Sequence, residues 1–286
     1  MKLYEPQTIK KIKSKYGFRF SKSLGQNFLI DKEVIDAIVD GAGCTENDLV
    51  IEIGPGIGVL TQALSEKAGK VVAIEIDKGL AEIMKYTLKD AENVTVVVDN
   101  VLKTDISALI EKEKGDLEHV KVLGNLPYYI TSAIITKLLK EKIDAESITV
   151  MMQKEVAERL LSSPGSKAYG ALTLAVRYYA DVVPVKDVPK TCFMPSPKVD
   201  SEVVRMDLLD SPRVTPLSEK RFFDVIRGAF SQRRKTLPNS LGAAGITKDA
   251  AGEILDTLGI DRTRRAETLT MEDFKAISDE LVKRGI

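Results

Sequence analysis

The sequence has few residues suited to metal binding or covalent catalysis. Its 286 residues include one histidine, His119, and two cysteines, Cys44 and Cys192. Structural zinc needs several Cys or His ligands, and a Ser-His-Asp or Cys-His nucleophile needs a histidine base. Two cysteines also cannot build a disulfide framework. We therefore expect no metal and no covalent nucleophile, and we place His119 in a loop or at a strand edge.

Long hydrophobic runs are absent too. Hydrophobic residues make up 44% and charged residues 29%, and no apolar stretch is long enough to cross a bilayer. The segment Met1–Pro6 lacks the apolar core of a secretion signal. These features predict no membrane role and a cytoplasmic protein, which we expect to be a monomer.

Net charge is zero, with 42 Lys and Arg against 42 Asp and Glu, so the total gives no support for a nucleic-acid partner. The distribution is uneven, however. Residues 1–22 hold seven basic residues and one acid, Glu5, and 227–237 holds Arg227, Arg233, Arg234 and Lys235 with no acid. Such patches are typical either of solvated surfaces or of contacts to a phosphate backbone.

Apolar strands alternate with helical patterns through the first half of the chain. A helix is expected after Asp31, and the apolar spacing predicts helices over 59–68, 78–89, 105–114 and 131–142. The strands predicted between them are Leu49–Ile53, Val71–Ile76, Val94–Val98, Val120–Leu123 and Ile148–Met152. This order predicts an α/β fold with a mostly parallel sheet.

The pattern changes further along the chain. After a helix over Glu155–Leu161, Val182–Val185 and Val199–Met206 fit a closing antiparallel edge pair. Helical patterns then take over at 218–230, 248–258 and 271–284. We therefore predict a domain over 1–210 and a small all-helical domain over 211–286.

The first strand runs into a glycine-rich turn, Glu52-Ile53-Gly54-Pro55-Gly56-Ile57-Gly58. Such a turn lets the backbone approach a ligand, and Glu75, at the end of the second strand, suits the two hydroxyls of a ribose. A dehydrogenase would need Gly-x-Gly-x-x-Gly, but Val59 stands where the third glycine belongs. The spacing favours S-adenosylmethionine over NAD.

A second motif, Asn125-Leu126-Pro127-Tyr128, follows the fourth strand. The Asn125 side-chain carbonyl and the Leu126 backbone carbonyl can accept from an exocyclic amino group, Pro127 fixes the backbone, and Tyr128 offers a stacking surface. A turn without chemical function is the alternative. With the glycine turn, the motif predicts a base-modifying methyltransferase.

With both motifs in hand, the chain resembles the ribosomal RNA adenine N6,N6-dimethyltransferase family, specifically its bacterial small-subunit members, over nearly its full length. The likeness also rests on residues 23–29 (Ser-Leu-Gly-Gln-Asn-Phe-Leu), 193–201 (Phe-Met-Pro-Ser-Pro-Lys-Val-Asp-Ser) and 230–237 (Phe-Ser-Gln-Arg-Arg-Lys-Thr-Leu). The resemblance implies a class I, Rossmann-like methyltransferase domain that binds S-adenosylmethionine.

By position, the resemblance assigns cofactor contacts to Asn27, Leu29, Gly54 and Glu75, with Asn125 serving both cofactor and base. The family usually has an acidic residue beside the cofactor's adenine where this chain has Asn100, whose carbonyl can still accept; Asp99 is the alternative. Further, the likeness makes Phe193 a second stacking residue opposite Tyr128. It leaves Arg233, Arg234 and Lys235 as candidate RNA contacts.

The resemblance implies dimethylation of two adjacent adenosines in a 3′-terminal hairpin of small-subunit ribosomal RNA, with a role in small-subunit biogenesis and the immature subunit as partner. Attack by the amino nitrogen on the methyl group needs positioning rather than a strong base, so Glu52 is expected to be structural or to orient the cofactor. Two alternatives stay open: a large-subunit methyltransferase of the antibiotic-resistance type, and a mainly non-catalytic assembly factor.

Overall fold

The computed structural model describes residues 1–21 and 24–286, so Lys22 of the basic N-terminal segment and Ser23 of the 23–29 motif lie outside the described residues. Two compact units are present. The first contains Met1–Ala157 and Val182–Leu208, and the second contains Glu158–Asp181 and Leu209–Ile286. The second unit thus takes in a segment that the predicted boundary near residue 210 assigned to the first domain. The functional roles of the two parts stay predictions.

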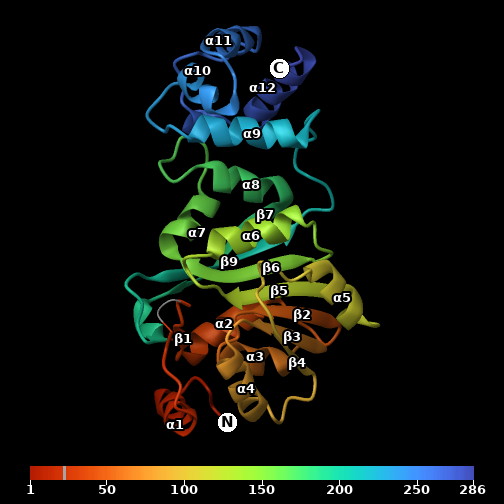
Figure 1. Ribbon diagram of the computed structural model, residues 1–286, viewed down its shortest axis with the longest axis vertical. Helices are drawn as coiled ribbons and strands as arrows, with labels where there is room; N and C mark the ends of the chain where they lie inside the picture. Colours follow the sequence, from red (N-terminus) through yellow and green to blue (C-terminus); the bar gives the residue numbers. More distant parts are fainter. Residues whose placement is uncertain (22–23) are drawn as a thin grey trace. The chain divides into compact units, whose positions relative to one another are not determined.

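The first unit is built on a mixed sheet with the order β4-β3-β2-β5-β6-β9-β7 (Figure 1). Neighbours from β4 to β6 are parallel, and β9 is antiparallel to β6, as the sequence predicted for a closing strand. All the predicted strands are confirmed. Their bounds are β2 (Asp48–Ile53), β3 (Lys70–Glu75), β4 (Val94–Val98), β5 (His119–Asn125), β6 (Ser147–Gln153), β7 (Ala180–Val188) and β9 (Ser201–Leu208). His119 is exposed at the start of β5.

One helix, over Lys32–Ala42, precedes β2, and crossover helices connect the parallel strands, each at the predicted place. Aspartates begin three of them, because the carboxylates of Asp31, Asp77 and Asp105 accept hydrogen bonds from backbone N–H groups of the first turn. The helices are α2 (Lys32–Ala42), α3 (Val59–Ser65), α4 (Lys78–Thr87), α5 (Ile106–Lys114) and α6 (Thr131–Lys140).

Alternation along the strands divides the buried residues between the two faces of the sheet. Val50, Ala73 and Leu123 pack in one core with the apolar faces of α2, α3 and α4. Glu52, Glu75 and Asn125 follow them at a spacing of two residues, so their side chains belong to the same face. The sheet therefore brings three polar groups together at the carboxyl ends of β2, β3 and β5.

An N-terminal helix, α1 (Pro6–Tyr16), was not predicted from the sequence. Pro6 lies in its first turn, and Gly17 ends it with a φ of 63°. Ile9 and Ile12 are its buried residues. The chain continues into a short strand, β1 (Phe28–Leu29), which pairs with β8 (Phe193–Met194).

The second unit is helical apart from Ala180 and Asp181, which begin β7. Its buried core includes Tyr178, Phe222 and Phe274. The predicted C-terminal helices are confirmed, whereas α8 was not predicted. The helical segments are α7 (Lys154–Leu161, which begins in the first unit), α8 (Ala171–Tyr179), α9 (Glu219–Phe230), α10 (Leu237–Ser240), α11 (Lys248–Thr257) and α12 (Met271–Lys283). No described helix is both long and apolar enough to span a bilayer.

Candidate functional site

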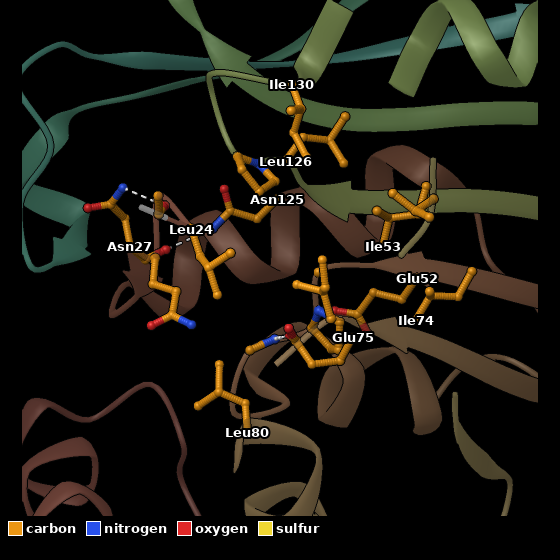
Figure 2. A pocket seen from close by; sticks show the side chains of 18 of the residues that line it. Leu24, Asn27, Glu52, Ile53, Ile74, Glu75, Leu80, Asn125, Leu126 and Ile130 are labelled. Carbon is orange, nitrogen blue, oxygen red and sulfur yellow. Dashed lines mark hydrogen bonds between the residues drawn. The ribbon is translucent and has the colours of Figure 1, made fainter. Parts of the chain in front are cut away.

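A pocket of about 990 Å³, including space open to solvent, lies at the carboxyl ends of β2, β3 and β5. Ligands bind at this edge of open α/β sheets because loops from several strands converge there. Figure 2 shows Glu52, Glu75 and Asn125 around this pocket, with Leu24 and Asn27 from the N-terminal segment beside them. The predicted cofactor residues Asn27, Leu29, Gly54, Glu75, Asn100 and Asn125 all line it.

The glycine turn forms one wall of the pocket. Gly54, Gly56 and Gly58 have φ values of 71°, 64° and 87°, which side chains other than glycine rarely adopt. A Cβ on Gly56 would also lie 2.8 Å from the Phe28 ring. Glycine is therefore required at Gly56 by backbone geometry and by close packing of the N-terminal segment.

Glu75 holds this turn from the neighbouring strand. Its Oε2 accepts a hydrogen bond from Gly56 N at 3.0 Å, and its Oε1 accepts from Asp77 N at 2.9 Å. Burial raises the pKa of Glu75 above its ordinary value, while these backbone N–H groups oppose the shift. Each carboxylate oxygen still has a second lone pair for a ligand hydroxyl.

Glu52 lies deeper, with 1% of its side chain exposed. Its Oε2 has no hydrogen-bond partner among the described residues, although it borders the pocket. Burial raises the pKa of Glu52 to about 8, and the nearby Glu75 carboxylate adds to the rise. The pocket therefore contains a buried acid, and a cationic ligand beside it would favour the ionised form of that acid.

Asn125 has a defined orientation. Its Nδ2 donates to the backbone carbonyl of Asn27 at 3.0 Å, shown by a dashed line in Figure 2. The Asn27 side chain in turn donates to the carbonyl of Gly25 at 3.0 Å. Because the amide nitrogen of Asn125 is engaged, the oxygen Oδ1 is the end that remains to accept from a ligand.

The N-terminal segment 24–29 is fastened to the pocket by Gln26 as well. Gln26 Nε2 donates to Asp77 Oδ2 at 3.1 Å, and Gln26 Oε1 accepts from Ser21 N at 2.7 Å. Asp77 also begins α4 by accepting from Gly79 N. No individual role for Gln26, Phe28 or Asp77 was predicted from the sequence. Their positions within or beside the recognised motifs were the only available signal.

Asp99 and Asn100 both border the pocket, but their side-chain oxygens already accept hydrogen bonds. Asp99 accepts from Asn100 N and from Thr104 Oγ1, and Asn100 Oδ1 accepts from Leu102 N at 3.0 Å. The Thr104 hydroxyl and the Asn100 N–H lower the pKa of Asp99. Either residue would have to share an acceptor already in use.

The predicted base-binding residues Asn125, Leu126, Pro127 and Tyr128 also line the pocket. The Leu126 side chain is buried. Pro127 O accepts from Ile130 N at 3.1 Å and from Thr131 Oγ1 at 3.0 Å, which shapes the turn. The Tyr128 hydroxyl is 2.7 Å from Ser201 Oγ, and burial raises its pKa.

Phe193 lies outside the lining of this pocket. It is 3% exposed, belongs to the core cluster of the first unit, and pairs with Leu29 in the β1–β8 ladder. It is not among the residues that border the pocket with Tyr128. The sandwich of one base between Tyr128 and Phe193 therefore stays a prediction, and it requires the Phe193 side chain to move.

The three basic residues in 233–235 differ in their surroundings. Arg233 Nη2 donates to the backbone carbonyls of Lys167 and Tyr169, both at 2.9 Å, so it braces a loop of the second unit. Arg234 and Lys235 are exposed, and neither has an ion-pair partner among the described residues. An RNA-binding role suits Arg234 and Lys235 better than Arg233.

The polar groups of the pocket suit a ligand that carries both a nucleoside and a positive charge. Acidic groups at Glu52 and Glu75 suit positive charge and ribose hydroxyls, and the glycine turn permits close backbone approach. Within the described residues, no group of three or more His, Cys, Asp and Glu side chains could hold a metal ion. The fold and pocket together define a class I, Rossmann-like methyltransferase.

Comparison with known proteins gives the family. The family model for ribosomal RNA adenine dimethylase matches residues 17–283. A protein of Alkaliphilus oremlandii named ribosomal RNA small subunit methyltransferase A is 48% identical over 285 residues, covering 99% of each chain. The protein belongs to the ribosomal RNA adenine dimethylase family.

Solved structures agree with this assignment. A dimethyladenosine transferase from Plasmodium falciparum is 27% identical, with a TM-score of 0.77 over 91% of this chain and 98% of that chain. The 23S rRNA methyltransferase ErmE is 26% identical, with a TM-score of 0.67 over 90% of this chain and 100% of that one. The predicted fold class is confirmed.

Proposed function

We propose that the protein transfers methyl groups from S-adenosylmethionine to the N6 amino groups of two adjacent adenosines in a 3′-terminal hairpin of small-subunit ribosomal RNA. The observation that carries the proposal is the orientation of Asn125. Its Nδ2 is bound to Asn27 O, which leaves Oδ1 as an acceptor for an amino group at the pocket. An acceptor suits adenine N6, which carries two N–H donors.

The cofactor would lie along the glycine turn. Glu75 would accept from the ribose hydroxyls, Gly54 would border the methionine end, and Asn27 and Leu29 would cover it from the N-terminal segment. Asn100 or Asp99 would contact its adenine. The cofactor supplies an electrophilic methyl group on a cationic sulfur, and Glu52 is the buried acid whose ionised form would favour that charge.

Asn125 and Leu126 would hold the target base. The amino nitrogen of adenine is a poor nucleophile because its lone pair is delocalised into the ring. Hydrogen bonds from its two N–H groups to Asn125 Oδ1 and the Leu126 carbonyl would favour a pyramidal nitrogen as the new bond to carbon forms, and the proton that the nitrogen then loses would pass to water. These residues act by position and by hydrogen bonding, without a strong base.

Tyr128 would stack on the face of the base. Extruding an adenine costs a few kcal/mol, and stacking on an aromatic ring returns about 1–3 kcal/mol per base. The partly exposed Tyr128 borders the pocket, whereas Phe193 is buried. Tyr128 therefore provides the initial stacking surface, and Phe193 would contribute after a side-chain rearrangement.

A basic surface on the second unit would contact the RNA backbone. Backbone hydrogen bonds join Gly165 to Glu267 and Leu237 to Arg264, bringing three segments together. Exposed cations without an ion-pair partner in the described chain lie on them: Lys167, Arg234, Lys235 and Arg265. Such contacts position RNA by its phosphates rather than by its sequence.

The direct test uses radiolabelled S-adenosylmethionine with under-methylated small subunits, large subunits or no RNA. The proposal predicts label in small-subunit RNA alone. Label in large-subunit RNA would instead support the activity named for ErmE, to which this chain is 26% identical. Tight binding to small subunits without label would support a non-catalytic assembly factor. If the wild-type protein is active, an Asn125→Ala variant that binds small subunits but transfers no label would separate binding from catalysis.

A further inference from the structure

Among the described residues, the Tyr128 hydroxyl has one hydrogen-bonding side chain as partner, and it comes from a distant strand. Tyr128 Oη and Ser201 Oγ are 2.7 Å apart, although 73 positions separate them in the sequence. Ser201 begins β9, is fully buried, and pairs with Gln153 on β6. The contact therefore ties the base-binding turn to the end of the sheet.

A buried serine at the start of β9 needs an explanation. The neighbouring β9 residues Val203, Val204 and Met206 are buried and apolar, as expected for an inner strand. A buried hydroxyl costs free energy unless it is hydrogen-bonded. Among the described side chains, Tyr128 is the one that satisfies Ser201.

The contact also restrains the ring. At the backbone end, Pro127 O is held by Ile130 N and Thr131 Oγ1. At the other end, Ser201 holds the phenol oxygen. A ring fixed at both ends cannot rotate freely about its two side-chain torsions, so its face keeps one orientation toward the pocket. Burial raises the pKa of the Tyr128 hydroxyl, so the group stays protonated at neutral pH.

We propose that Ser201 is a positioning residue, which fixes the Tyr128 ring plane so that its face meets the adenine held by Asn125. Ser201 does not border the pocket and would not touch the base. The inference rests on the proposed methyl transfer to adenine. It assigns to Ser201 a specific contribution to orientation, and positioning of reactants is a large part of catalysis.

A double-mutant cycle tests this role with Ser201→Ala, Tyr128→Phe and the double variant. Each single substitution removes the same hydrogen bond while keeping an aromatic ring in the pocket. We expect kcat on small subunits to fall about 10-fold in each, the usual scale for one lost hydrogen bond. The double variant should be no slower than either single one, and the affinity for S-adenosylmethionine should stay unchanged.

Thr149→Val is the matched control, because Thr149 is a buried hydroxyl residue on β6 without a hydrogen-bond partner. It should leave kcat unchanged. Additive losses in the double variant, or a wild-type kcat in Ser201→Ala, would overturn the role of Ser201. If Ser201→Ala does not fold, an unchanged kcat in Tyr128→Phe would overturn it as well. Absence of methyl transfer by the wild-type protein would instead refute the proposed function.

Discussion

Gln26 and Asp77 join the N-terminal segment to the start of α4 through a hydrogen bond of 3.1 Å between Nε2 and Oδ2. Asp77 N in turn donates to Glu75, and Glu75 accepts from Gly56 N. The N-terminal segment, the Glu75 carboxylate and the glycine turn are therefore one connected network. A cofactor in the pocket would be covered by a segment that Asp77 at the start of α4 and Asn125 on β5 hold in place.

The first prediction concerns this network. Gln26→Glu would set a carboxylate against Asp77, so the segment would be repelled from the pocket. We expect the dissociation constant for S-adenosylmethionine to rise about 10-fold, equivalent to about 1.4 kcal/mol. Isothermal titration calorimetry measures it. Gln7→Glu, an exposed change of equal charge on α1, serves as the control. If Gln26→Glu and Gln7→Glu bind S-adenosylmethionine equally well, the contact between Gln26 and Asp77 does not hold the segment at the pocket.

The second prediction concerns Asn125→Asp. An aspartate cannot donate to Asn27 O, and its negative charge faces a carbonyl oxygen, so the acceptor loses its fixed orientation. We expect kcat to fall at least about 100-fold, because a misdirected or unpaired polar group that is shielded from water costs roughly 1–3 kcal/mol or more. Single-turnover kinetics on small subunits measures the methyl-transfer step. A variant with wild-type kcat would remove Asn125 from the mechanism.

The third prediction concerns pH. The pKa of Glu52 is raised from 4.5 to about 8 in the folded protein, so the folded state holds this proton more tightly than the unfolded chain does. Glu52 imposes no penalty below pH 4.5. Stability should then fall as pH rises from about 4.5 to 8, by up to about 1.4 kcal/mol per pH unit from this group.

Glu52→Gln removes that titration and keeps the side-chain volume. Denaturant unfolding of both proteins at pH 5 and pH 8.5 should show the variant gaining stability relative to wild type at the higher pH. Parallel pH dependences in the two proteins would mean that Glu52 titrates near its ordinary value.

The fourth prediction separates the adjacent arginines. Arg234→Glu with Lys235→Glu should weaken binding to small subunits and reduce its salt dependence, because exposed phosphate contacts are lost. Arg233→Ala should mainly lower the free energy of unfolding, since its guanidinium braces Lys167 and Tyr169. Lys248→Glu on α11 is an exposed control. Filter binding at several salt concentrations and thermal unfolding give the two readouts; equal loss of stability in all variants would contradict the distinction.

The sequence predicted the strands of the sheet and its crossover helices, because their apolar periodicity is strong. It did not predict α8 (Ala171–Tyr179), where a nearly continuous apolar and aromatic run hides the helical period. Helix α1 was also missed, since only Ile9 and Ile12 are buried on a lysine-rich segment. Its Pro6 start and Gly17 end were signals of a helix that went unused.

The pocket residues on strand ends were predictable for a similar reason: register places Glu75 and Asn125 at one edge of the sheet. Contacts between residues that are far apart in the sequence were not predictable. The hydrogen bond from Gln26 to Asp77 and the contact of Tyr128 with Ser201 have no local pattern. The buried position of Phe193 likewise depends on β1 pairing with β8.

The central claim is tested most directly by mass spectrometry of the small-subunit RNA after reaction with S-adenosylmethionine. The account predicts two adjacent N6,N6-dimethyladenosines in one 3′-terminal hairpin fragment, and a strongly reduced yield of them with Asn125→Asp at the same reaction time. Methyl groups on another base, on ribose, or on no nucleotide at all would contradict it.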